Sequence, residues 1–305
     1  MTAASSQTNV KPEEPPIVVS IEPFDAALGA EIRGVDLSRP VDGADFALIE
    51  QAYYDYSVLL FRDQRITPEQ QIALSRRFGE LQIHVLGQWR HPQHAEILII
   101  SNVKESERHV GVYNAGRYWH ADLSYMQSPS RGSLLYAIEI PQGSDHPLGD
   151  TLFSSVTAAY DALPDATKNR IRHLRAAFSL AHHRAKLMAD GDTTEAALTE
   201  EQLANTPTAV HRIVQAHPVT GCKCLFVNEG HTVEILDFPA AEAGELLAEL
   251  CAHCTRPEFV YRHHWRIGDL LMWDNIATQH LAVFDYLQEQ RRYMHRTTLA
   301  GVELD

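Results

Sequence analysis

Short apolar runs separated by turn residues dominate the chain and predict a sheet-rich protein. Glycines such as Gly29 and Gly34 mark the turns beside the first of these runs. Strands are expected at residues 18–24, 30–35, 57–61, 97–100, 133–140, 259–265, 269–273 and 291–299, with a hairpin over 216–227. Many short strands of this kind favour a single sheet-based domain, which we place at residues 17–305.

Helical patterns interrupt the strands, mostly in the first two-thirds of the chain. Helices are expected at residues 42–54, 67–78, 156–163, 165–174 and 240–254. The second begins with Thr67-Pro68-Glu69-Gln70, in which a capping side chain precedes a proline in the first turn. Residues 182–212 are rich in Ala, Thr, Glu and His with little alternation, so we expect a long irregular stretch that forms a lid-like insertion.

Composition and charge narrow the class of protein. The 305 residues are 45% hydrophobic, which is enough for a substantial core. The formal net charge of −14 disfavours nucleic acid as a partner, because phosphate backbones repel an acidic protein. No apolar run approaches the ~20 residues that cross a membrane. Residues 1–16 are polar and lack the apolar segment of a signal peptide, so we expect a disordered tail on a cytoplasmic protein.

The most informative motif is His120-Ala121-Asp122. In an extended strand both side chains would point to one face, where an imidazole and a carboxylate can bind one metal ion. With a histidine from a distant strand they would form the two-His-one-carboxylate triad that is typical of non-heme Fe(II) oxygenases. His280 is the best candidate for that third ligand, although 17 histidines make any single one weak evidence.

The strand predicted after His280 adds a second kind of chemistry. Arg292, Met294 and Arg296 alternate along it, so two guanidinium groups are expected on one face. Near a metal they could hold the distal carboxylate of a 2-oxoacid and the anion of a substrate. Alternatively, they are surface arginines paired with the abundant acidic residues.

Other kinds of site have less support. The four cysteines, Cys222, Cys224, Cys251 and Cys254, have a spacing that zinc sites use, but the two pairs fall in a predicted hairpin and a predicted helix. We therefore expect reduced, mostly buried thiols. The chain has no glycine-rich nucleotide loop, no Gly-x-Ser-x-Gly and no His-Glu-x-x-His, which disfavours nucleotide-dependent and serine-hydrolase chemistry.

Taken in order, the motifs of the chain resemble those of the Fe(II)/2-oxoglutarate dioxygenases of the taurine dioxygenase (TauD/TfdA) family. The resemblance covers about residues 21–301. The segments that carry it are Gly29–Leu37, Arg77–Gly79, Trp119–Asp122, Gly149–Thr151, Phe226–Gly230, Gly268–Asp269, Trp273–Asn275, Gln279–His280 and Arg292–Arg296.

This resemblance implies a fold, a reaction and a set of site residues. The fold is a double-stranded β-helix (jelly roll), mainly β with flanking helices, and the assembly is a homodimer or homotetramer. By position, the Fe(II) ligands are His120, Asp122 and His280. The residues that match those binding the co-substrate 2-oxoglutarate are Thr151 and Arg292, and those that match the holders of the substrate anion are His84 and Arg296. With O₂, such an enzyme hydroxylates its substrate and releases succinate and CO₂.

Departures from the taurine enzyme argue against taurine as the substrate. Gly87 stands where a tyrosine lies near the substrate amine, His231 replaces a pocket phenylalanine, and Arg184 falls near a second aromatic position. We expect a larger pocket that is more polar on one side. The expected substrate is a sulfonate, an alkyl sulfate, or an aryloxy or other carboxylate, with C–S or C–O cleavage where the hydroxylated carbon bears sulfur or oxygen.

Alternative functions stay open. The segments 101–103 and 119–126 are also similar to the isonitrile-forming branch of the family, which oxidises N-substituted amino acids, although its lysine–tyrosine pair is not evident here. A zinc-dependent hydrolase or a metal-binding protein could use His120 and Asp122 with a third ligand. The intact triad argues against an iron-free relative that only binds an anion.

Overall fold

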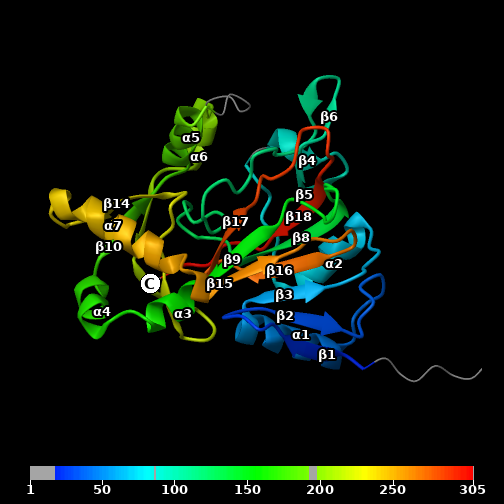
Figure 1. Cartoon of the computed structure of the whole chain (residues 1–305), viewed down its shortest axis with the longest axis horizontal. Helices are drawn as coiled ribbons and strands as arrows, with labels where there is room; N and C mark the ends of the chain where they lie inside the picture. The colour runs from blue at the N-terminus through cyan, green and yellow to red at the C-terminus, as the bar shows by residue number, and fades with distance from the viewer. Residues whose placement is uncertain (1–17, 86, 192–197, 305) are drawn as a thin grey trace, which may run out of the picture.

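A large, mostly antiparallel sheet forms the centre of the protein (Figure 1). The computed structural model describes residues 18–85, 87–191 and 198–304, so the expected tail at 1–16 lies outside the described residues. The strand order is β1 (Ser20–Pro23), β2 (Ala30–Arg33), β3 (Val58–Phe61), β16 (Leu270–Asp274), β8 (Gly132–Glu139), β18 (Tyr293–Thr298), β5 (His94–Ser101) and β4 (Arg90–His91). Because β16 pairs with both β3 and β8, strands from the two ends of the chain lie side by side.

A smaller sheet faces the large one and completes the expected jelly roll. Its strands are β15 (Val260–His263), β9 (Thr151–Ser155) and β17 (Thr278–Ala282), in that order. Phe153 on β9 and Trp273 on β16 belong to one buried cluster, and their ring centroids are 5.5 Å apart. The two sheets therefore share one apolar core, as the double-stranded β-helix requires.

Helices cover the outer face of the large sheet. Val58 and Leu60 of β3 belong to the core between the sheets, whereas Leu59 and Phe61 pack in a separate cluster with α1 (Gly43–Tyr56) and α2 (Pro68–Phe78). Both faces of β3 are thus buried, which explains its unbroken apolar run. The predicted cap of α2 is confirmed, because the Thr67 side chain accepts from the Gln70 backbone and the Gln70 side chain accepts from the Thr67 backbone.

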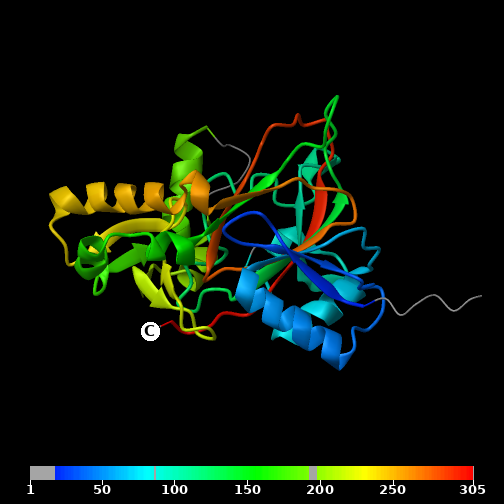
Figure 2. The ribbon, with the colours of Figure 1, turned by 60° about the horizontal axis from the view of Figure 1, so that its bottom comes forward.

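A second layer of helices and strands lies beside the jelly roll, on the left of Figures 1 and 2. Its buried residues form one continuous cluster. Its elements are α3 (Val156–Asp161), α4 (Asp165–Ile171), β10 (Arg175–Phe178), β11 (Ala209–Arg212), β12 (Val214–Ala216), β13 (Lys223–Leu225), β14 (Thr232–Leu236) and α7 (Ala240–Cys254). The expected hairpin at 216–227 is confirmed as the antiparallel pair β12–β13. None of the helices in the described ranges is long and apolar enough to cross a bilayer.

The prediction of an irregular stretch over residues 182–212 is wrong. This range contains most of α5 (Leu180–Ala189), all of α6 (Glu200–Asn205) and β11, while residues 192–197 lie outside the described residues. The apolar signal of α5 is weak, because Leu180 and Leu187 are its only buried residues. The role of this range as a lid stays a prediction. Other short elements that the pattern did not predict are η1 (Gly87–Trp89), β6 (Lys104–Glu105), β7 (Arg108–His109) and η2 (Pro257–Phe259).

Gly132, at the start of β8, is packed so tightly that even an alanine side chain is expected to destabilise the protein. A Cβ atom added to Gly132 would lie 2.3 Å from the Tyr53 hydroxyl and 2.7 Å from the Trp273 carbonyl oxygen. Since overpacking costs about 1–3 kcal/mol, we expect Gly132→Ala to lower the free energy of unfolding by about that amount in urea titrations. Tyr53→Phe should recover part of the loss in the double variant.

Gly244 offers the matched control for Gly132. It is exposed in the middle of α7, and an added Cβ atom would meet nothing within 4 Å. Gly244→Ala should therefore stabilise the protein by about 0.5–1 kcal/mol. Equal stability of the Gly132→Ala variant and the unmodified protein would contradict the packing argument.

Candidate active site

A backbone bridge brings the two candidate histidine ligands together. His120 and His280 form an isolated antiparallel bridge, with N–O distances of 3.0 Å and 2.8 Å for the two hydrogen bonds between their main chains. Residues paired in this way lie directly opposite each other on one face. Their ring centroids are 4.1 Å apart. The long-range contact that the sequence required is therefore present.

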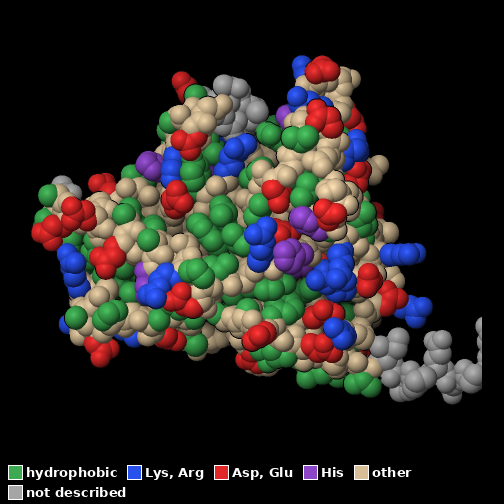
Figure 3. Space-filling model, viewed as in Figure 1, with side chains coloured by type: hydrophobic (Ala, Val, Ile, Leu, Met, Phe, Trp, Pro, Cys, Tyr) green, Lys and Arg blue, Asp and Glu red, His purple; other side chains and the backbone are tan. Residues whose placement is uncertain are grey.

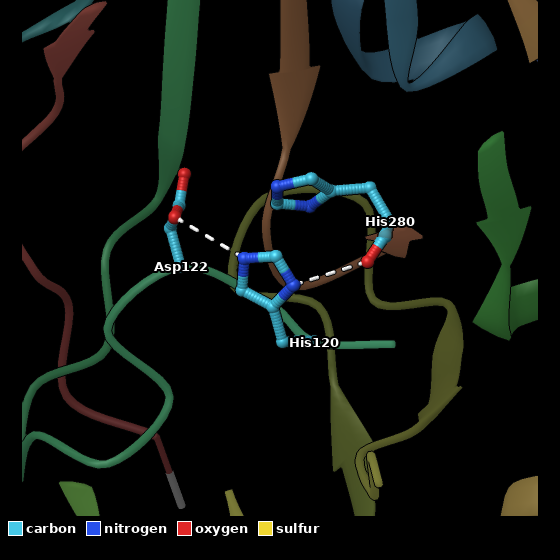
Figure 4. Close-up of side chains that lie close together, drawn as sticks. All are labelled: His120, Asp122 and His280. Atoms are coloured by element: carbon cyan, nitrogen blue, oxygen red, sulfur yellow. Dashed lines mark hydrogen bonds and ion pairs between the residues drawn. The ribbon is translucent and has the colours of Figure 1, made fainter. Parts of the chain in front are cut away.

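Asp122 lies close to the two histidines, but its backbone conformation differs from the predicted strand. Residues 122–125 form a turn rather than an extended strand, and Leu123 has a left-handed φ of 55°. The expected strand alternation between His120 and Asp122 is therefore wrong. The turn nevertheless places the Asp122 Oδ1 atom 3.8 Å from His120 Nε2 (Figure 4). Within the described ranges, His120, Asp122 and His280 are the one group whose three ligand atoms lie within 4.8 Å of one another.

The two imidazoles have the lone pairs that a metal needs. His120 Nδ1 lies 2.9 Å from the Tyr118 carbonyl oxygen and 3.1 Å from that of His280, so Nδ1 carries the proton and Nε2 is left for a metal. The buried Nδ1 atom of His280 has no hydrogen-bond partner among the described residues, so no protein group occupies a lone pair of this ring. Burial lowers the pKa of both histidines, so both rings are neutral at pH 7. This donor set fits a divalent metal such as Fe(II).

The Asp122 carboxylate is held ionised by its neighbours. Burial alone would raise its pKa, but the Arg296 guanidinium, His280 and His120 and a hydrogen bond from Ser133 outweigh burial and leave the pKa below its usual range. Arg296 Nη1 donates to Oδ1 at 2.7 Å, and Ser133 Oγ donates to Oδ2 at 2.7 Å. The sequence did not predict that Arg296 pairs with the carboxylate ligand.

A cavity beside the three ligands contains a buried cation without a counterion. Arg292 and Thr151 line this cavity together with His120, His280 and Arg296. Arg292 is 6% exposed, and its side chain has no ion pair or hydrogen bond among the described residues. Thr151 Oγ1 accepts from Trp265 Nε1 at 2.9 Å, which leaves the Thr151 hydroxyl proton free to be donated into the cavity. A buried cation and a hydroxyl donor make this cavity a site for an anion.

The neighbouring arginine is excluded from this role. Arg291 is exposed and forms two hydrogen bonds to Glu139, at 2.6 Å and 2.9 Å. Gly149 also shapes the anion cavity, because its φ is +78° and an added Cβ atom would lie 3.3 Å from Arg292 Nε. The predicted pair of inward-facing guanidinium groups, Arg292 and Arg296, is thus present in one cavity.

A second cavity adjoins the first and meets it at His120 and Arg296. Of the five positions expected to contact a substrate, this cavity is lined by His84, Arg184, His231 and Arg296. Burial, and then Arg296, lower the pKa of His84 to about 3, so His84 is a neutral hydrogen-bonding group there. Gly87 is not among the lining residues. It lies in η1, and the Arg90 guanidinium is the nearest group to an added Cβ atom.

The sequence pattern did not identify His183 or the face of α5 to which it belongs as part of this cavity. Leu180, His183, Arg184 and Leu187 line the cavity from one face of α5. Their spacing of three and four residues is the helical signal that could have identified this face.

The Trp273-Asp274-Asn275 motif supports the site through hydrogen bonds to the candidate ligand Asp122 rather than by supplying a ligand itself. Asn275 Oδ1 accepts from the Asp122 backbone at 3.2 Å and from Trp273 Nε1 at 2.9 Å. Its amide nitrogen donates to Ser133 Oγ at 3.3 Å, and Ser133 in turn donates to Asp122. Asn275 therefore fixes both the turn and the carboxylate of Asp122.

The four cysteines form no metal site in the described residues. All four thiols are free, with Cys224 and Cys254 buried and Cys222 exposed. Burial raises the pKa of Cys224 and Cys251 to about 12, so both thiols are protonated at neutral pH.

Comparisons with known proteins identify the family of the chain. Residues 20–298 match the family described as taurine catabolism dioxygenase TauD, TfdA family. The chain is 34% identical over 292 residues to the alpha-ketoglutarate-dependent 2,4-dichlorophenoxyacetate dioxygenase of Cupriavidus pinatubonensis, covering 92% of this chain and 98% of the relative. It is 30% identical over 287 residues to the alpha-ketoglutarate-dependent sulfate ester dioxygenase of Pseudomonas putida, and this match covers 93% of this chain and 90% of the relative.

A solved structure extends the similarity to three dimensions. The crystal structure of AAD-2 in complex with Mn(II) and N-oxalylglycine has a TM-score of 0.78 and 33% identity to the chain, and the match covers 94% of this chain and 98% of that one. Since the family match spans most of the chain and the relatives are covered almost completely, the chain belongs to the TauD/TfdA family and is a 2-oxoglutarate-dependent dioxygenase.

Proposed function

We propose that this enzyme binds Fe(II) through His120, Asp122 and His280 and hydroxylates a small anionic organic substrate. In the overall reaction 2-oxoglutarate, O₂ and a C–H group give succinate, CO₂ and a C–OH group. One oxygen atom of O₂ enters succinate and the other enters the product. If the hydroxylated carbon also bears oxygen or sulfur, the product breaks its C–O or C–S bond.

The single observation that carries this proposal is the unpaired, buried Arg292 next to the three ligands. A buried charge is costly unless a partner compensates it, so the cavity is built for an anion that comes from outside the chain. 2-Oxoglutarate has a carboxylate at each end. Arg292 would bind the distal carboxylate, and the 2-oxo end would lie beside His120 and His280, which line the same cavity.

Each residue of the site has a physical task in this reaction. His120, Asp122 and His280 would hold Fe(II), which would supply the activation of O₂ when bound. Thr151 would donate a hydrogen bond to the co-substrate through its hydroxyl group, because its oxygen already accepts a hydrogen bond from Trp265. Asn275 and Ser133 hold Asp122 in one orientation, so the carboxylate does not have to reorganise when the metal binds.

The substrate anion is proposed to bind at Arg296 and His84. Both residues line the second cavity, and Arg296 contacts Asp122, so an anion held there lies close to the metal. Relatives act on an aryloxyacetate and on sulfate esters, and each of these substrates carries one anionic group. These similarities support an aryloxy acid or an alkyl sulfate as the substrate class.

A zinc hydrolase could use the same three ligands, but it would leave Arg292 without a function. Hydrolysis uses a metal-bound water as its nucleophile and needs no chelating anion. A dianionic co-substrate that chelates the metal would need a cation beside the ligands, and Arg292 lines the same cavity as His120 and His280. The unpaired Arg292 therefore favours the dioxygenase.

We expect Arg292→Leu to raise the apparent KM for 2-oxoglutarate by about 30-fold or more. Loss of one partner of a buried, hydrogen-bonded charge pair costs at least about 2 kcal/mol, which corresponds to that factor. The measurement is succinate release at varied 2-oxoglutarate with saturating substrate. Arg291→Leu is the control, since the adjacent arginine is exposed and should leave KM within about twofold. Equal KM values for the two variants would exclude the proposed role of Arg292.

Metal content tests the ligand set directly. Protein reconstituted with Fe(II) under anaerobic conditions should bind about one ion per chain, and Asp122→Ala or His280→Ala should lose most of it, because only two ligands remain. His264→Ala is the control, as His264 is exposed and contacts Asp150 rather than the site. Succinate release that does not depend on added Fe(II), or full iron binding by the Asp122→Ala variant, would overturn the assignment.

A further inference from the structure

We propose that His183 and His231 form a polar subsite that selects substrates carrying a second hydrogen-bonding group away from their anion. The favoured class is a small organic anion with a hydroxyl or carboxamide at its other end. This inference rests on the proposed function, because it places the subsite in the substrate cavity. It adds a selection that Arg296 and His84 do not provide.

The hydrogen bonds around His231 determine which of its ring nitrogens carries the proton. Asn228 Oδ1 accepts from the His231 backbone at 2.8 Å, so the other side-chain atom of Asn228 is the donor that contacts Ser124 Oγ at 3.2 Å. Ser124 Oγ lies 3.0 Å from His231 Nδ1, the one acceptor found for its hydroxyl proton among the described residues. His231 Nδ1 thus accepts, and Nε2 carries the ring proton.

His183 has the opposite arrangement. Its Nδ1 atom lies 3.0 Å from the Gly230 carbonyl oxygen, which can only accept, so Nδ1 carries the proton. His183 Nε2 therefore has a free lone pair. The ring centroids of His183 and His231 are 4.8 Å apart, and both residues line the second cavity. One cavity wall consequently presents an N–H donor beside a nitrogen acceptor.

The subsite is not a second anion site, because both imidazoles are neutral. His231 Nδ1 accepts from Ser124, which leaves a single proton on the His231 ring, and burial lowers the pKa of His183 to about 4. Tyr125 closes the wall beside them, with its ring centroid 5.0 Å from that of His231. The N–H group of His231 and the free nitrogen lone pair of His183 together match a substrate group that both accepts and donates a hydrogen bond, such as a hydroxyl or a carboxamide.

An apolar substituent would be rejected at this wall. A methyl group or a halogen would remove water from both imidazoles and leave a buried N–H and a buried lone pair without partners. Sites that hydrogen-bond a substrate hydroxyl reject the analogue that lacks it much more strongly than apolar pockets distinguish methylene groups. The two histidines therefore act as specificity-determining residues.

The test uses two substrate pairs in which a hydroxyl replaces a methyl group of similar size. They are 4-hydroxyphenoxyacetate with 4-methylphenoxyacetate, and 4-hydroxybutyl sulfate with pentyl sulfate. The readouts are kcat/KM from succinate release and Kd from anaerobic calorimetric titration of the protein loaded with Fe(II) and 2-oxoglutarate. In at least one pair the hydroxylated member should be favoured by about tenfold or more in both quantities.

The variants connect this preference to the two histidines. His231→Phe should abolish or reverse the preference, His183→Leu should reduce it, and the control His182→Leu, which replaces the exposed neighbour on α5, should leave it unchanged. Thermal unfolding verifies that each variant is folded. No preference in the unmodified enzyme, no measurable binding of either hydroxylated probe, or a preference that persists in His231→Phe would overturn the subsite. Binding that shows the preference without any succinate release would retain the subsite and reject the proposed function.

Discussion

The catalytic centre depends on two backbone hydrogen bonds between His120 and His280. These residues are far apart in the chain, and the loop between them closes at an entropic cost that grows only slowly with its length. Sheet pairing offsets this cost, because His280 belongs to β17, which pairs with β9 along its whole length. The bridge then fixes both imidazoles on one face. The relative position of the two imidazoles therefore follows from sheet pairing rather than from local sequence.

The remaining ligand is secured by a polar network rather than by a strand. Asp122 lies in a turn, and a turn is more mobile than a sheet unless side chains hold it. Asn275 binds its backbone while Ser133 and Arg296 bind its two carboxylate oxygens. Asn275 follows β16 directly, Ser133 belongs to β8 and Arg296 belongs to β18, so the large sheet positions the turn through three side chains.

The sequence allowed most of the large sheet to be predicted, together with the close approach of the three candidate ligands, because unbroken apolar runs and distinctive motifs carry strong local signals. Val58–Phe61 is apolar at every position, and burial on both faces explains why. The sequence pattern failed where polar residues face inward. α5 turns His183 and Arg184 toward a cavity, so its sequence lacks the apolar stripe that identifies a helix. The pairing of Arg296 with Asp122 was equally hidden, because it depends on the turn at 122–125.

The acidic net charge of the chain does not oppose the binding of anions at this site. Acidic and basic side chains are interspersed over the face shown in Figure 3, and charges at the surface are screened beyond about 8 Å at physiological salt. Arg292 and Arg296 are 6% and 7% exposed, so their attraction acts in a medium of lower dielectric constant with little screening. Burial lowers the pKa of Arg292, yet a guanidinium remains charged at neutral pH. Because Asp122 already compensates part of the Arg296 charge, the uncompensated Arg292 is the stronger anion site. Under the proposed function, charge would therefore be the main attraction for the co-substrate in the Arg292 cavity, whereas the shape and hydrogen bonding of the wall would contribute more to substrate selection in the second cavity.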